Sequence, residues 1–129
     1  MKTGLKNNEL GAFKKMLQEI ENVVNDDNKA TINGRTYQLS AMTHKQRLPF
    51  LQYYQDIQPQ LNGVAKKSMD FETVEDMLKN IVLFDGALMK NIPTHFDKYP
   101  QDYMAYINTM LMATVFPFLK DSLAPLKDL

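Results

Sequence analysis

The sequence predicts a mainly α-helical protein of about four helices, with one short β-hairpin between the first and second helices. Three observations predict this fold class. Apolar residues recur at helical spacing along most of the chain, and the dipeptide Asn33-Gly34 marks one tight hairpin. A chain of 129 residues is also long enough to bury one hydrophobic core. We therefore expect a single domain over residues 1–129, with flexible ends at 1–7 and 120–129.

The first predicted helix runs from about Asn8 to Val24. Its apolar residues are separated by intervals of three and four positions, which gives a continuous apolar stripe on one helix face. These residues are Leu10, Phe13, Leu17, Ile20 and Val24. The polar run from Asn25 to Asn28 ends the helix and begins the turn into the hairpin.

The predicted hairpin covers about residues 29–39. Asn33 and Gly34 both tolerate positive φ, as the two central positions of a type I′ turn require. This turn pairs Ile32 with Arg35 and Ala30 with Tyr37. The apolar side chains then share one face; they are Ala30, Ile32, Tyr37 and Leu39. A two-stranded ribbon is marginal alone, so we expect it to lie on the helices or on another chain.

The second predicted helix begins after Thr43. Thr43 and Gln46 have the spacing of a capping box, in which each side chain bonds the other residue's backbone N–H. Apolar residues at helical spacing follow, at Leu48, Leu51, Tyr54, Ile57 and Leu61. Pro49 predicts either a separate first turn or a kink, and Asn62-Gly63 ends the segment.

The third predicted helix runs from about Phe71 to Lys90, with Asp70 or Ser68 as its cap. Asp85-Gly86 falls inside its apolar pattern and marks either a break or a close helix contact. A loop over residues 91–100 leads to the fourth predicted helix.

The fourth predicted helix runs from about Gln101 to Leu119 and is apolar around most of its circumference. Such a helix is typically central to a core or shared with another chain. We expect the tail over residues 120–129 either to fray or to dock.

Composition excludes several classes of function. Lys plus Arg and Asp plus Glu number 15 each, so the net charge is zero, and neither a nucleic-acid-binding face nor a polybasic membrane anchor is indicated. The absence of Cys excludes disulfides, thiolate nucleophiles and nearly all structural zinc sites, and suits a reducing cytoplasm. We expect no signal peptide and no transmembrane span, because the longest uncharged stretch, 103–119, is shorter than the about 20 apolar residues that a span needs.

No catalytic constellation is found in the sequence. There is no serine elbow and no glycine-rich phosphate loop, and the chain has two histidines, His44 and His95. The pair His95 and Asp97 has weak metal-ligand spacing, so we expect a structural or solvent-facing His95. We expect an exposed His44, with an interface role as the alternative. The sequence thus predicts a non-enzymatic protein without catalytic, cofactor-binding or metal-binding residues.

The methionines and aromatic residues are the candidate partner contacts. Met104, Met110 and Met112, three of the nine methionines, cluster on the fourth predicted helix. Flexible Met side chains serve either as gap-fillers in a core or as an adaptable binding surface. In a chain without Trp, Tyr is the most suitable interface anchor. The candidates, several of which must simply be core, are Ile32, Tyr37, Leu39, Tyr53, Tyr54, Met104, Met110 and Met112.

The run from Thr31 to Thr43 resembles the opening of tail assembly chaperones of tailed phages, including chaperones for the baseplate hubs of contractile-tailed phages. Those proteins carry an I-N-G-x-x-Y-x-L hairpin, then a short step ending in Thr and a long helix. The matching residues are Ile32, Asn33, Gly34, Tyr37, Leu39 and Thr43. This chain differs from the simplest form by the amphipathic helix that precedes the hairpin.

The resemblance implies a non-enzymatic protein of the host cytoplasm that binds apolar segments of another tail or baseplate protein until assembly. Such a client could be the tape measure or a hub component, and a homo-oligomer is compatible with the sequence. One alternative is a structural component of the virion tail or baseplate, whose hairpin adds strands to a neighbouring sheet. Another is a small helical regulator that binds a host protein. Nucleic-acid and membrane partners are not expected.

Overall fold

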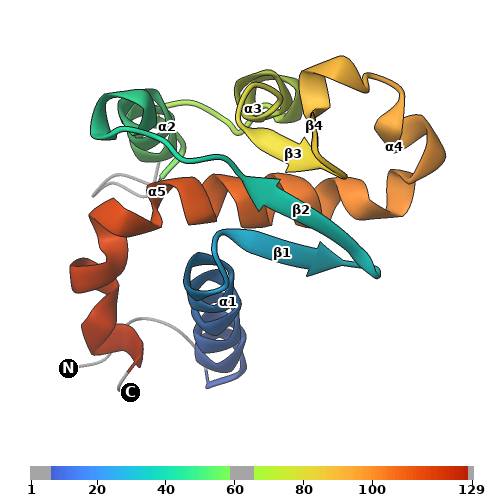
Figure 1. Cartoon of the computed structure of the whole chain (residues 1–129). Coiled ribbons are helices and arrows are strands. Elements are labelled where there is room, and N and C mark those ends of the chain that lie inside the picture. Colours follow the sequence, from blue (N-terminus) through green and yellow to red (C-terminus); the bar gives the residue numbers. More distant parts are fainter. Residues whose placement is uncertain (1–6, 59–65, 128–129) are drawn as a thin grey trace.

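The computed structural model describes residues 7–58 and 66–127. In this part of the chain, five α-helices and two short 3-10 helices surround a four-stranded antiparallel sheet (Figure 1). The fold is therefore mixed α/β. The predicted hairpin between the first two helices is present in a helix-rich fold, but the prediction of a mainly α protein with a single hairpin was wrong. The helices are α1 (Asn7–Asn25), α2 (His44–Ile57), α3 (Phe71–Leu78), η1 (Met89–Asn91), α4 (His95–Lys98), η2 (Pro100–Asp102) and α5 (Tyr103–Lys127). The strands are β1 (Lys29–Ile32), β2 (Arg35–Leu39), β3 (Val82–Phe84) and β4 (Ala87–Leu88).

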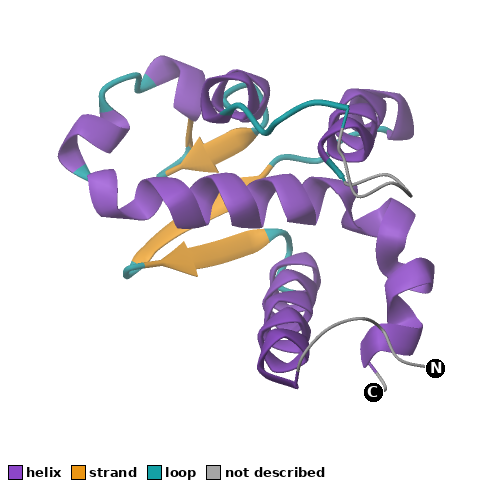
Figure 2. Cartoon of the chain, turned by 180° about the vertical axis from the view of Figure 1, so that it is seen from behind, coloured by secondary structure: helices purple, strands orange, loops and turns teal. Residues whose placement is uncertain are grey.

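The first hairpin has the predicted register. Ile32 pairs with Arg35 and Ala30 with Tyr37, and Asn33 and Gly34 have φ of 52° and 83°. The face predicted to be apolar is buried: Ala30, Ile32, Tyr37 and Leu39 are each at most 8% exposed. The ribbon lies on the helices of its own chain, because α5 crosses this face of the sheet (Figures 1 and 2).

A second hairpin replaces the C-terminal half of the predicted third helix. Helix α3 ends at Leu78, and Asp85 and Gly86, with φ of 53° and 82°, connect β3 to β4. These angles repeat those of the first turn, so Asp85-Gly86 acts as a hairpin turn and not as a helix break. The strand is favoured because Val82 pairs with Leu39 and is completely buried beside it.

The second predicted helix begins as expected but ends earlier. Thr43 and Gln46 form the capping box, with bonds of 3.2 Å and 2.8 Å between side chains and backbone N–H groups. Pro49 lies inside one continuous helix. The helix ends at Ile57 because Gln58 precedes Pro59 and is extended, at φ −80° and ψ 143°. Leu61 and the predicted end at Asn62-Gly63 lie outside the described residues.

The core lies between the sheet and α5. Helix α5 contributes much of this core, and Tyr106, Ile107 and Met110 on it have no exposed surface. The predicted fourth helix thus is central to the fold, and it continues beyond Leu119 to Lys127, so the tail over 120–127 is helical. The segment 91–100, predicted to be a loop, contains the short helix α4 and the first residue of η2. Both the second hairpin and these short helices bring residues to the N-terminal end of α5.

Replacement of glycine by alanine distinguishes the second hairpin from the predicted helix. A Cβ on Gly86 would meet no atom within 4 Å, so Gly86→Ala should destabilise the protein only through the left-handed backbone, by about 1 kcal/mol. The helical Gly11 also has open space, so Gly11→Ala should stabilise the protein by up to about 1 kcal/mol. Urea unfolding of both variants measures the two effects. Stabilisation by Gly86→Ala would indicate a helix at this position.

Candidate functional site

A buried polar cluster joins the first hairpin to the start of α5. We call it the Asp102 cluster; it consists of Asn33, Arg35, Tyr37, His95 and Asp102. The Asp102 carboxylate, with no exposed surface, accepts four hydrogen bonds. Arg35 donates through Nε and Nη2 at 2.6 Å and 2.7 Å, the Tyr37 hydroxyl at 2.6 Å and Asn33 Nδ2 at 2.8 Å. The carboxylate is thus fully partnered by the hairpin.

His95 extends this cluster to α4. Its Nε2 lies 2.7 Å from the Tyr37 hydroxyl. Because Tyr37 donates its only proton to Asp102, His95 must donate from Nε2, which fixes its tautomer. The His95 ring is 7% exposed and lies 4.4 Å and 5.1 Å from the Phe84 and Tyr99 rings, centroid to centroid. His95 therefore hydrogen-bonds Tyr37 and is otherwise packed against aromatic rings.

Charge and burial shift the pKa values of this cluster. The hydrogen bonds from Arg35 hold the pKa of Asp102 well below its usual range. Burial, reinforced by the bond to Asp102, raises the pKa of Tyr37. Burial lowers the pKa of His95. The ground state is consequently an ion pair of Arg35 and Asp102 beside a neutral phenol and a neutral imidazole.

The Asp102 cluster is built to hold structure. Asp102, Tyr37 and His95 are each at most 7% exposed, and the Tyr37 hydroxyl hydrogen-bonds both the Asp102 carboxylate and His95 Nε2. Arg35 is further held by stacking over Tyr99, at 4.1 Å from its ring centroid. The cluster therefore fixes the hairpin against α5, and the expectation of a structural His95 agrees with its contacts.

The side chains of His95 and Asp97 are not directed at a common point. His95 points its Nε2 at Tyr37, whereas Asp97 is exposed. No group of three or more His, Cys, Asp or Glu side chains suited to a metal ion occurs among residues 7–58 and 66–127. His44 is exposed, as expected, and its ring lies 5.4 Å from that of Phe118.

The predicted partner-contact residues divide into three groups by burial. Four belong to the core and are at most 8% exposed: Ile32, Tyr37, Leu39 and Met110. Three are half-buried: Tyr53, Tyr54 and Met112. Met104 is 52% exposed. The Tyr53 hydroxyl accepts a 2.7 Å bond from the Asp70 N–H and so ties α2 to the cap of α3.

Tyr54 and Met112 line one groove between α1, α2 and α5, which we call the apolar groove. Its volume is about 560 Å³. Its apolar lining residues are Ile20, Tyr54, Ile57, Met69, Ala105, Leu111 and Met112. Burial raises the pKa of Tyr54, consistent with an apolar environment. Sequence reasoning found Tyr54 and Met112 but not Met69, which lies in a connector without periodicity.

Comparison with protein-family models, with curated proteins and with solved structures gives no match for this chain. None of the described helices is long and apolar enough to cross a membrane.

Two tyrosines with opposite hydrogen-bond states test the Asp102 cluster. Tyr37→Phe removes a donor to a buried carboxylate and should destabilise the protein by about 2 kcal/mol. The Tyr106 hydroxyl is buried and has no partner among the described residues, so Tyr106→Phe should stabilise the protein by about 1 kcal/mol. Thermal and urea unfolding compare them. Equal effects of the two substitutions would contradict the assigned network.

The same cluster predicts loss of stability in acid. Asp102 has a lowered folded pKa, so its contribution is present above its unfolded pKa of about 3.9 and is lost as pH falls towards the folded value. His95 also has a lowered pKa, so its contribution is lost below its unfolded pKa of about 6.5. Urea unfolding between pH 7 and pH 3 should show a decline in two stages.

Single substitutions separate the two stages. His95→Gln should flatten the first decline, which begins below about pH 6.5, and Asp102→Asn should flatten the second, which begins near about pH 4, each in a less stable protein. His44→Gln is the control, because His44 is exposed. A wild-type profile that is level down to pH 3 would contradict the assigned pKa directions.

Proposed function

We propose that this chain is a non-enzymatic binding protein of the host cytoplasm that assists assembly of a phage tail or baseplate. In this proposal it holds an apolar segment of another tail protein until that protein is assembled. The observation that carries the proposal is the apolar groove, which offers half-buried Tyr54 and Met112 to a partner. The resemblance of the Thr31–Thr43 run to tail assembly chaperones supports the choice of client.

The dimensions and chemistry of the apolar groove suit a few apolar side chains. A volume of about 560 Å³ lies in the range of ordinary ligand sites, about 300–1,000 Å³. Met69 and Met112 are unbranched, so they can adapt to side chains of different shape. Tyr54 supplies rigid aromatic area with a polar end. A segment with apolar residues on one side can bury them here.

Polar residues at the groove restrict what enters. Glu19, Asn108 and Thr109 also line it. This mixture of apolar and polar lining residues resembles the usual composition of a protein–protein contact. A client therefore should bring apolar anchors flanked by polar residues and not a uniformly apolar surface.

Three methionine substitutions on α5 test the proposal. Met112→Lys should leave a cooperative thermal melt and reduce recovery of the client by about tenfold or more, because a charge enters the groove. Met110→Lys should abolish the cooperative melt, because Met110 is completely buried. Met104→Lys, at an exposed position, should change neither. Client recovery is measured by pull-down and mass spectrometry from cells that express the surrounding genes.

Purified particles provide the second readout. A chaperone should be recovered with a long tail protein and be absent from particles. Presence in particles at a fixed copy number would make the chain a structural subunit and overturn the proposal. Equal recovery of the client with Met112→Lys and Met104→Lys would remove the apolar groove from the interaction.

A further inference from the structure

Strand β1 has an edge that no other described strand pairs with. The strand order is β1-β2-β3-β4, so within residues 7–58 and 66–127 β1 pairs with β2 alone. In a hairpin with a two-residue turn, the pairs Ile32–Arg35 and Ala30–Tyr37 exchange their backbone bonds. The bond from Leu39 N–H to the Asn28 carbonyl, at 2.9 Å, continues this alternation. The backbone groups of the residues between these pairs consequently point away from β2.

Those outward groups belong to Lys29 and Thr31. The Lys29 N–H donates to the Asp26 carbonyl at 3.1 Å and is therefore used. The Lys29 carbonyl and both the N–H and the carbonyl of Thr31 remain at the edge. An antiparallel strand placed alongside can exchange two bonds with Thr31 and donate one to Lys29. The free edge therefore has the donors and acceptors that strand addition uses.

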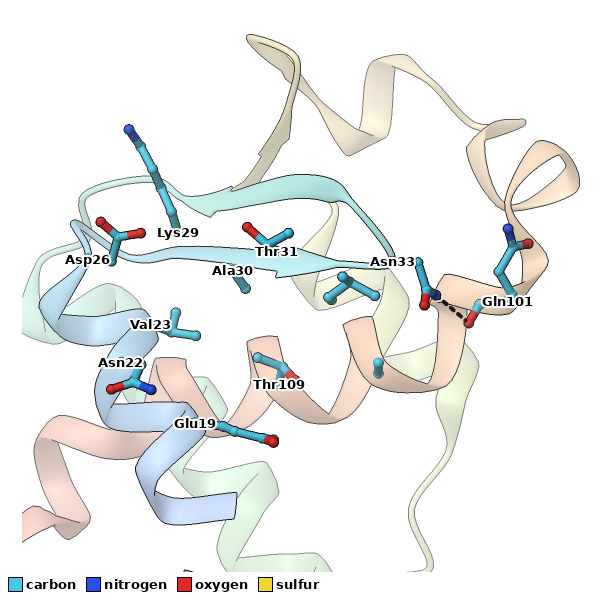
Figure 3. A pocket seen from close by; sticks show the side chains of 12 residues that line it. Glu19, Asn22, Val23, Asp26, Lys29, Ala30, Thr31, Asn33, Gln101 and Thr109 are labelled. Atoms are coloured by element: carbon cyan, nitrogen blue, oxygen red, sulfur yellow. Dashed lines mark hydrogen bonds between the residues drawn. The ribbon is translucent and has the colours of Figure 1, made fainter. Parts of the chain in front are cut away.

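This edge borders a groove of about 650 Å³ between α1, β1 and α5, which we call the β1-edge groove (Figure 3). Its far wall is formed by Gln101 just before α5 and by Ala105 and Thr109 on it, which recur every fourth residue and so share one helix face. Small Ala105 leaves room beside the strand. Because α1 flanks the edge, a single extended chain fits this groove better than the sheet of another folded copy does.

The charges of the groove select the occupant. Glu19 and Asp26 of the α1 side line it, against one cation, Lys29. Figure 3 shows Glu19 reaching from α1 towards α5. No hydrogen bond or ion pair of the Glu19 side chain is found in the described part of the chain. Residues of an added strand opposite Ala30 and Ile32 would point to the α5 side, where Glu19 lies.

We propose that the β1-edge groove binds an extended segment of a partner protein as a fifth strand, with a Lys or Arg side chain directed at Glu19. The backbone bonds to Thr31 and Lys29 hold the segment, and the carboxylate of Glu19 selects its basic side chain. The backbone contacts at Lys29 and Thr31 lie outside the apolar groove, so the binding of a strand-forming peptide is tested separately from the proposed chaperone function.

The test uses the capped peptide Gly-Thr-Val-Lys-Val-Thr-Gly, which is extended by composition and carries one central cation. Titration of the labelled full-length protein, followed by amide NMR, should shift the Thr31 amide signal more than those of β4. Fluorescence anisotropy should show binding weaker by about tenfold for the peptide with Glu in place of Lys. N-methylation of the peptide amide that faces Thr31 should abolish binding.

Protein variants assign the contacts. Glu19→Lys should weaken binding by about tenfold, whereas Glu72→Lys, at an exposed residue of α3, should not. Thr31→Pro removes the N–H at the edge and leaves the hydrogen bonds between β1 and β2 intact, so it should abolish peptide binding. Thr31→Val keeps this N–H and should leave peptide binding unchanged. Circular dichroism checks that each variant is folded, and the N-methylated peptide gives the backbone readout independently of Thr31→Pro.

Three results would overturn this assignment. They are an unshifted Thr31 amide at saturating peptide, equal binding of the Lys and Glu peptides, and self-association of the protein that protects the Thr31 amide without peptide. The last result would indicate that a second copy of this chain pairs with the edge of β1.

Discussion

The buried Asp102 carboxylate is the constraint on which the arrangement of sheet and helix depends. Its four hydrogen bonds come from Asn33 in the hairpin turn, from Arg35 and from Tyr37. The Tyr37 hydroxyl also hydrogen-bonds His95 of α4. A buried charge is costly unless every acceptor position is filled. The observed placement of the hairpin against the start of α5 fills all four. The same placement sets α5 across the sheet and buries Tyr106 and Met110 beneath it. Core packing and polar satisfaction therefore select the same register.

Local signals predicted much of the fold, and they failed where two of them competed. Asn33-Gly34 between alternating apolar residues specified the first hairpin, and Thr43 with Gln46 specified the start of α2. Asp85-Gly86 is the same type of turn signal, but it follows apolar residues from Phe71 onward that fit a helical period. The competition is decided by tertiary structure, because Val82 pairs with Leu39 only once the first hairpin is in place. Short apolar runs remain ambiguous between helix and strand until such a neighbour is known.

The candidate sites were also predictable to different degrees, because some depend on local spacing and others on residues far apart in the sequence. Helical spacing and residue type indicated Tyr54 and Met112, and the structure places both in one groove. Nothing near Asp102 in the sequence signals its role, since its partners Asn33, Arg35 and Tyr37 lie 65 to 69 residues away. The unpaired edge of β1 could not be predicted from the sequence for a further reason. The sequence shows a strand, but only the order of strands shows which edge stays unpaired.

Helix α1 separates the two proposed binding regions and links them. Glu19 on α1 and Ala105 and Thr109 on α5 line both the apolar groove and the β1-edge groove. The distance between α1 and α5 consequently sets the width of both grooves. A ligand that draws these helices together in one groove therefore narrows the other groove. A client in the apolar groove and an extended segment at β1 should then influence each other's affinity, and by the same factor in both directions. Substitutions at the shared residues affect both regions. Thr31 and Met112, each lining one groove alone, are therefore the positions that separate the two interactions.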